Sequence, residues 1–147
     1  MPHTRKGERF TQLVLEIFRL GGILAAQGDE LTSEFGLSSA RWKVLGTLEM
    51  SDSPPTVPQI ARTMGLTRQA VQRLANAMEA DGLLRYQNNP QHKRASHVVM
   101  TKEGREIYAL ISEKQIPWAN QTAEKFDVAE LETSLSNLRK IILLLEH

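Results

Sequence analysis

Gly65 constrains this chain more than any other residue. It separates two short helical patterns within residues 59–82, QIARTMGLTRQAVQRLANAMEADG. Before it, Thr56 and Gln59 have the spacing of a capping box, in which the two side chains each satisfy a free backbone N–H group. This pattern predicts a helix that begins after Thr56 and ends at Gly65. Gly65 can adopt the positive φ of a tight turn without a Cβ penalty.

A second helix is predicted directly after this turn. Thr67 can cap it, and Gly82 stands where a left-handed residue often ends a helix. Apolar residues recur at i, i+3, i+4 and i+7 and define one buried face: Val71, Leu74, Ala75 and Met78. Two short helices joined by a tight glycine turn, the second of them polar on its outer face, predict a helix-turn-helix.

The outward face of this second helix has the side chains with which proteins read DNA. A rotation of about 100° per residue from Val71 places arginine and amide side chains away from the buried face. Arginine pairs with guanine, and glutamine or asparagine with adenine. No acid that would repel phosphates occurs between Thr56 and Met78, and the first turn can hold a phosphate. We therefore predict contacts with double-stranded DNA from Thr67, Arg68, Gln69, Gln72, Arg73 and Asn76.

Charge is unevenly distributed along the chain, although the net charge is only +1. Residues 53–105 contain eight Lys and Arg residues and three Asp and Glu residues, a net charge of +5. Residues 1–52 and 106–147 together contain ten basic and fourteen acidic residues, a net charge of −4. This asymmetry favours contact of the middle region with a polyanion.

Two stretches of strand composition follow the second helix, LLRYQ at 83–87 and SHVVM at 96–100. The loop between them, NNPQHKRA, is turn-forming and basic, which predicts a β-hairpin with an extended tip. Its tip residues His92, Lys93 and Arg94 can enter an adjacent minor groove or contact the DNA backbone. We add Lys93 and Arg94 to the predicted DNA contacts. A helix-turn-helix followed by such a hairpin is a winged helix-turn-helix.

Further helices are predicted on both sides of this region. Apolar residues recur at helical spacing in the first part of the chain and predict a helix that runs to Glu34 or Phe35 and stops at Gly36. After the hairpin, Thr101 begins a helix that Pro117 should kink or end.

The final helix is predicted to begin with a second capping box, DVAE at 127–130. It has an apolar seam about two heptads long, formed by Leu131, Leu135, Leu138, Ile142 and Leu145. An apolar C-terminal helix of this kind must be covered by another surface. That surface is the first helix of this chain, the same elements of a second copy, or both. The run IILLL is far too short to span a bilayer, so no membrane contact is expected.

The predicted fold is mainly α: a winged helix-turn-helix with a two-stranded β-hairpin wing, plus N- and C-terminal helices that form a dimerisation region. We place the DNA-binding domain at 37–105 and the helical dimerisation region at 1–36 and 106–147.

Several function classes are disfavoured by the residues present. The chain has no cysteine, which excludes disulfide frameworks, cysteine zinc fingers and thiol redox sensing. His92 and His97 lack a third ligand type nearby, so neither a metal site nor a cofactor is expected. No nucleophile–base pair, glycine-rich phosphate loop or paired carboxylates suggest an enzyme. The basic amino terminus is no secretion signal, and a cytoplasmic location is the expectation.

The order of these motifs resembles the MarR family of bacterial transcription regulators. The resemblance rests on LSSARWKVL, TVPQIARTMGLTRQAVQRLANAMEADGLL, the hairpin tip NPQHKRA and the stretch VVMTKEG, and its most specific part runs from Leu37 to Gly104. It implies a homodimer with interlocked terminal helices and one winged domain per copy. It also implies that residues 67–76 belong to the major-groove helix and that Arg94 is the minor-groove arginine of the wing.

The resemblance further implies a regulator, expected to be a repressor, that binds near-palindromic operators. It suggests a small aromatic or phenolic effector, held between the dimer helices and the winged domain. One position departs from the family pattern: His92 stands where members usually have an aspartate that braces the wing. His92 can replace it by hydrogen bonding, or gain a charge in mild acid and strengthen phosphate contact.

An alternative function is a winged-helix module that binds proteins without specific DNA binding. Such modules expose apolar anchors and need no arginine and amide face. Gln69, Gln72, Arg73 and Asn76 argue against this alternative.

Overall fold

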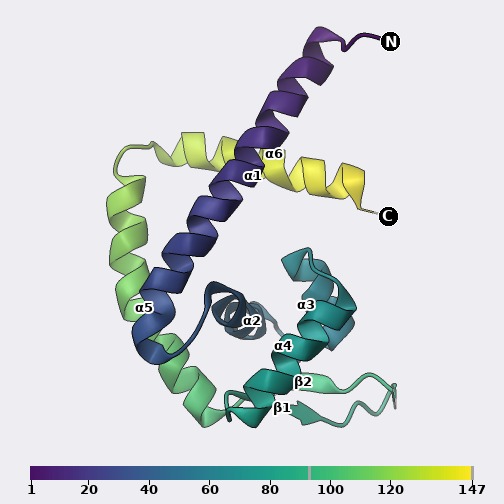
Figure 1. The fold of residues 1–147 in the computed structure, drawn as a ribbon, viewed down its shortest axis with the longest axis vertical. Coiled ribbons are helices and arrows are strands. Elements are labelled where there is room, and N and C mark those ends of the chain that lie inside the picture. Colours follow the sequence, from purple (N-terminus) through teal and green to yellow (C-terminus); the bar gives the residue numbers. More distant parts are fainter. Residues whose placement is uncertain (93, 147) are drawn as a thin grey trace. The chain divides into compact units, whose positions relative to one another are not determined.

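The computed structural model describes residues 1–92 and 94–146 (Figure 1). Its elements confirm the predicted fold class, mainly α with an antiparallel two-stranded hairpin after a helix-turn-helix. Lys93, a predicted DNA contact, lies outside the described residues. The chain divides into two compact units, Met1–Ile111 and Ser112–His147. The elements in chain order are α1 (Arg5–Thr32), the 3₁₀ helix η1 (Ser33–Phe35), α2 (Ser39–Met50), α3 (Val57–Met64), α4 (Arg68–Ala80), β1 (Leu84–Gln87), β2 (His97–Met100), α5 (Lys102–Ala123) and α6 (Val128–Leu145).

The predicted helix-turn-helix is formed by α3 and α4. Thr56 Oγ1 accepts the N–H of Gln59 at 3.4 Å, and Gln59 Oε1 accepts the N–H of Thr56 at 2.9 Å, so the capping box is complete. Gly65 has a φ of 67°, and Thr67 Oγ1 accepts the N–H of Ala70 at 3.1 Å. The turn and both helix starts therefore follow from short-range interactions that the sequence pattern predicts.

The core of the first unit lies among α2, α3, α4 and the hairpin. Fully burying one aliphatic side chain is worth about 1.5–3 kcal/mol, so these contacts hold the helix-turn-helix on α2 and on both strands. Leu37, Met64, Leu74, Tyr86, Met100, Ile107 and Tyr108 pack against this core with partial burial. The buried core residues are Val44, Leu45, Leu48, Val57, Ile60, Ala61, Val71, Ala75, Met78, Leu83, Leu84 and Val98.

The hairpin is anchored at its root by backbone hydrogen bonds. Within it, Tyr86 pairs with Val98 in an antiparallel register. Val98 N–H donates to the carbonyl of Pro55 at 2.8 Å, which ties β2 to the residue before the capping box of α3. Thr101 N–H donates to the carbonyl of Leu83 at 3.1 Å and closes the other side of the root. The wing therefore projects from a fixed base beside α4 (Figure 1).

The ends of two helices test two further predictions. The first helix gives way to η1, whose last residue is Phe35, and Gly36 follows with a φ of 70°, as expected. Pro117 lies inside α5, which continues to Ala123, so the helix does not end at this proline, one of the two effects expected of it. A proline lacks the N–H bond to the carbonyl four residues back, here that of Glu113, and its ring crowds this carbonyl, but the other backbone bonds of the helix remain available.

Both terminal helices expose rows of large apolar side chains. In the first unit, α1 exposes Phe10, Leu13, Leu15, Phe18, Leu20, Ile23 and Leu24. In the second unit, α6 begins with Asp127 N–H donating to Glu130 Oε1 at 3.2 Å. Its exposed side chains are Val128, Leu131, Leu135, Leu138, Ile142, Leu143, Leu144 and Leu145. No helix in the described part of the chain has the length and apolar character required to cross a membrane.

We expect Gly104→Ala to destabilise the fold. A Cβ at Gly104 would overlap the carbonyl oxygen of Leu83, and backbone cannot move aside as a flexible side chain can. The expected loss is about 1–3 kcal/mol in the free energy of unfolding, measured by urea denaturation.

Gly46→Ala in α2 is the matched control. Its added methyl would meet the Tyr108 ring at an ordinary 3.8 Å, so the gain in helix propensity, about 1 kcal/mol, should dominate. Equal stability of the two variants would contradict the assigned contact between Gly104 and Leu83.

Candidate nucleic-acid interface

The polar face of α4 points away from the core. Val71, Ala75 and Met78 are all 0% exposed, and their burial sets the rotation of the helix. The residues of α4 that are predicted to contact DNA bases lie on the other side of the helix. All of them are exposed: Arg68, Gln69, Gln72, Arg73 and Asn76. At the start of the helix, the Thr67 oxygen caps the first turn as an acceptor, which leaves its O–H free to donate to an anion.

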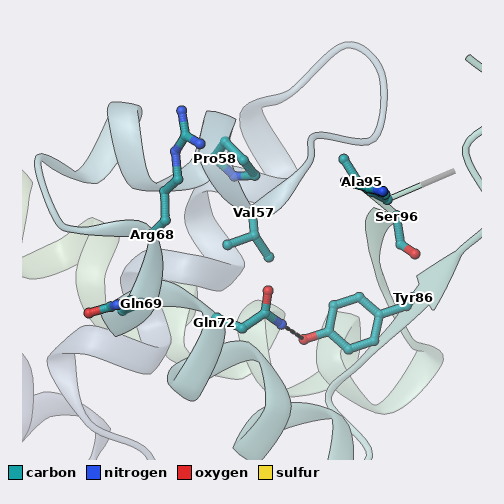
Figure 2. A pocket seen from close by; sticks show the side chains of 9 residues that line it. Val57, Pro58, Arg68, Gln69, Gln72, Tyr86, Ala95 and Ser96 are labelled. Atoms are coloured by element: carbon teal, nitrogen blue, oxygen red, sulfur yellow. Dashed lines mark hydrogen bonds between the residues drawn. The ribbon is translucent and has the colours of Figure 1, made fainter. Parts of the chain in front are cut away.

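A hollow of about 520 Å³ lies between the first turns of α4, the start of α3 and the wing residues 86 and 94–96. Figure 2 shows Arg68, Gln69 and Gln72 along α4 and Tyr86, Ala95 and Ser96 on the hairpin side. The start of α3 contributes Val57 and Pro58. The structure thus brings Arg68, Gln69 and Gln72 together with the predicted wing residue Arg94 around one hollow. Arg73 and Asn76 lie on the same helix but are not among its lining residues.

The electrostatic character of this face is positive. The described residues that line the hollow include the guanidinium groups of Arg68 and Arg94 and no carboxylate. The nearest acids in the sequence of α4 come at its end, Glu79 and Asp81. Asp81 pairs with Arg41 of α2 at 2.5 Å, so its charge is partly neutralised. An anion that enters the hollow therefore meets cations without a competing acid along the lining.

Asn89 organises the described part of the wing tip. Its Nδ2 donates to the carbonyl of Ala95 at 3.0 Å, and its Oδ1 accepts the N–H of Gln91 at 3.0 Å. Its own carbonyl accepts the N–H of His92 at 3.2 Å. Asn89 therefore closes the tip by joining its two sides, a bracing role that the sequence analysis did not assign to any residue beyond His92. An asparagine directly before a proline is a recognised turn signal and could have indicated this role.

Tyr86 joins the wing to the polar face of α4. Its hydroxyl donates to Asn76 Oδ1 at 2.6 Å and accepts from Gln72 Nε2 at 3.0 Å, and Gln72 Nε2 also donates to Asn76 Oδ1 at 2.9 Å. Figure 2 shows the Gln72 side chain directed toward Tyr86. Burial raises the pKa of Tyr86, and the charge of Glu79 raises this pKa further, so the phenol stays protonated at neutral pH.

Tyr86 is not among the residues that the sequence pattern predicts for this face. The available signal was the period of two in a strand, because Tyr86 shares one side of β1 with buried Leu84. That periodicity places the tyrosine toward the core and α4. It does not say which residues of α4 the hydroxyl meets.

Comparisons with known proteins show which sequences and folds this chain resembles. The sequence model of the MarR family matches residues 35–95, which contain α2, α3, α4 and most of the hairpin. An uncharacterized protein of Mycobacterium tuberculosis is 36% identical over 139 residues, with 95% of this chain and 96% of that protein covered. The transcriptional activatory protein BadR of Rhodopseudomonas palustris is 26% identical, with 93% of this chain and 80% of BadR covered.

Solved structures share the fold over most of the chain. A MarR/EmrR family regulator from an Acinetobacter species has a TM-score of 0.80 at 24% identity, covering 89% of this chain and 92% of that one. CouR of Rhodococcus jostii, bound to p-coumaroyl-CoA, has a TM-score of 0.78 at 19% identity, covering 88% and 91%. MepR in the S. aureus MepR–DNA complex has a TM-score of 0.76 at 19% identity, covering 88% and 96%. Residues 35–95, which the family model matches, therefore belong to the MarR family of transcription regulators, and the chain has the winged-helix DNA-binding fold of solved members of that family.

Proposed function

We propose that this chain is a sequence-specific repressor that binds near-palindromic operators as a homodimer and responds to a small-molecule effector. The observation that carries the proposal is the acid-free face of α4, on which arginine and amide side chains are exposed beside a positively charged hollow. Arginine and amides are the residue types that discriminate base edges in the major groove. In this proposal residues 37–105 form the DNA-binding domain.

The wing supplies a second contact with DNA. Arg94 is exposed and lines the hollow opposite α4, so a duplex with α4 in its major groove would bring the sugar–phosphate backbone or the adjacent minor groove to Arg94. Thr67 and Arg68, at the start of α4, would hold a phosphate at the other side of the hollow. MepR, a protein of the same fold, has been solved in complex with DNA.

The terminal helices, residues 1–36 and 106–147, form the dimerisation region in this proposal. The exposed apolar rows of α1 and α6 have the composition of surfaces that become buried in an obligate dimer. A two-fold dimer presents two copies of α4 and therefore requires two half-sites, with centres about one helical turn apart.

The proposal includes a small-molecule effector. CouR, which has the same fold, was solved bound to p-coumaroyl-CoA, which contains a phenol. A small aromatic or phenolic compound is therefore the ligand class to screen first. BadR is named an activatory protein, so a reporter assay with the identified operator decides between repression and activation.

The test of the proposal is to incubate the protein with sheared genomic DNA of its source organism at near-physiological salt and to sequence what it retains. An enriched near-palindrome is the expected result. Broad retention that disappears at modestly higher salt would leave only non-specific electrostatic binding and would refute the proposal.

Replacing Gln69 or Arg73 with alanine should relax the base preference. Each good pairing with a base is worth about 1–3 kcal/mol of discrimination, and this discrimination should disappear at one position of each half-site. Selection from randomised duplexes measures the base preference at each position. Lys43→Ala, an exposed basic residue on α2, should leave the preference unchanged. If Gln69→Ala also leaves it unchanged, our assignment of the reading face is wrong.

Arg94→Ala should weaken binding by about 1–3 kcal/mol, mostly on sites with A/T-rich flanks where the minor groove is narrow. Lys93→Ala should instead weaken binding to all sequences alike and reduce the salt slope by about 1, as expected for one lost phosphate contact. Titration of labelled duplexes at several salt concentrations separates the two effects. A loss with Arg94→Ala that is independent of the flanks would argue against minor-groove entry.

Replacing Leu138 and Ile142 together with glutamate should abolish the dimer and DNA affinity together, because charges in an apolar interface cost several kcal/mol. Sedimentation measures the oligomeric state, and DNA titration on the same samples measures the affinity. Asn137→Glu, one charge on the same helix, should leave the dimer intact. A stable monomer with undiminished DNA affinity would disprove the coupling.

A further inference from the structure

Three polar side chains form a closed hydrogen-bonded triangle where the wing meets α4. Gln72 and Asn76 lie four residues apart and thus on one face of the helix. Tyr86 approaches them from β1. The three links are 2.9 Å from Gln72 Nε2 to Asn76 Oδ1, 3.0 Å from Gln72 Nε2 to the Tyr86 oxygen, and 2.6 Å from that oxygen to Asn76 Oδ1.

The triangle uses the N–H donors of the Gln72 amide and the oxygen of the Asn76 amide. An amide group has two N–H donors and one carbonyl acceptor. Both donors of Gln72 are engaged, one to Asn76 and one to Tyr86, whereas its Oε1 has no role in the triangle. For Asn76 the reverse holds, because its Oδ1 accepts twice and its two N–H donors have no role.

This asymmetry limits what each amide can read. Bidentate pairing with adenine requires one donor and one acceptor from the same amide. Gln72 lacks a spare donor, and Asn76 Oδ1 already accepts two bonds. The adenine pairing that residue type alone suggests for these two residues is therefore not available while the triangle persists.

We propose that Tyr86 is a specificity-determining positioning residue, which orients Gln72 as an acceptor and Asn76 as a donor toward the base edges. This inference rests on the proposed DNA-binding function. Gln72 Oε1 would then select an exocyclic amino group, N4 of cytosine or N6 of adenine. Asn76 Nδ2 would select an acceptor, such as N7 or O6 of guanine or O4 of thymine.

The surroundings of Tyr86 favour persistence of the triangle. The ring is partly buried against the core, and its strand position is fixed by the pairing of Tyr86 with Val98. Burial and the charge of Glu79 both raise the pKa of Tyr86, so its hydroxyl keeps the proton that Asn76 accepts. The side chain that orients the two amides is thus itself held by the fold.

The first test is Tyr86→Phe, which removes the hydroxyl and keeps the ring in its packing. Base preference is measured by selection from randomised duplexes for the wild type, Tyr86→Phe, Gln72→Ala and Asn76→Ala. We expect Tyr86→Phe to lose discrimination, on the order of tenfold, only at the positions that Gln72→Ala and Asn76→Ala identify. The salt slope should not change, because no charge is removed.

Tyr108→Phe is the matched control, since it makes the same change at the other tyrosine, which lies on α5 and packs against the core beside Gly46 of α2. It should leave base preference as it is in the wild type. If the wild type selects a motif and Tyr86→Phe selects the same motif with equal stringency at every position, the inference is overturned although the proposed function stands. If the wild type selects no motif, the proposed function fails and the specificity role with it.

A second measurement needs no DNA. In the Tyr108→Phe background, ultraviolet titration reports the pKa of Tyr86 alone. Gln72→Ala should raise this pKa, because the Gln72 N–H stabilises the phenolate. Asn76→Ala should lower it, because the acceptor of the phenol proton is lost. If neither variant changes the pKa of Tyr86, the triangle does not exist in solution and the inference is overturned.

Discussion

The burial of one side of α4 determines which side chains this helix presents to solvent and to the wing. Val71, Ala75 and Met78 are inaccessible to solvent and span two turns, so the helix cannot rotate without exposing apolar surface. That rotation turns the arginine and amide side chains outward together. It also aims Gln72 toward the wing. A small rotation of α4 would move these groups off the face and separate them from Tyr86 at the same time.

The wing depends on the same core through its root. Hydrogen bonds from Val98 to Pro55 and from Thr101 to Leu83 attach the two strands to α3 and to the start of α5. The hydroxyl of Thr101 adds a bond to the carbonyl of Gly82 at 2.6 Å. The hairpin is therefore not an independent arm. Its position relative to α4 is set by backbone contacts, and this is why a side chain on β1 can reach two residues of the helix.

The sequence predicts those features that depend on neighbouring residues. The capping box at Thr56, the left-handed turn at Gly65 and the stop at Gly36 each involve groups within five positions, and all are present. Pro117 does not end α5, one of its two expected effects, because one missing N–H leaves the other backbone bonds of the helix in place. Tyr86 was not identified, because its partners lie 10 and 14 positions away and depend on how strand and helix pack.

The triangle at Tyr86 also restricts the conformational freedom of Gln72 and Asn76 on the polar face of α4. A free glutamine side chain loses about 1.5–2 kcal/mol of rotamer entropy when it is immobilised. Gln72 and Asn76 have already lost part of that freedom through their bonds to each other and to Tyr86. These side chains would therefore lose less conformational entropy when DNA binds. Such preorganisation favours selective binding over binding that requires the side chains to rearrange. In the proposed DNA complex, the hydroxyl of one wing tyrosine thus moves part of the entropic cost of binding into the folding of the chain.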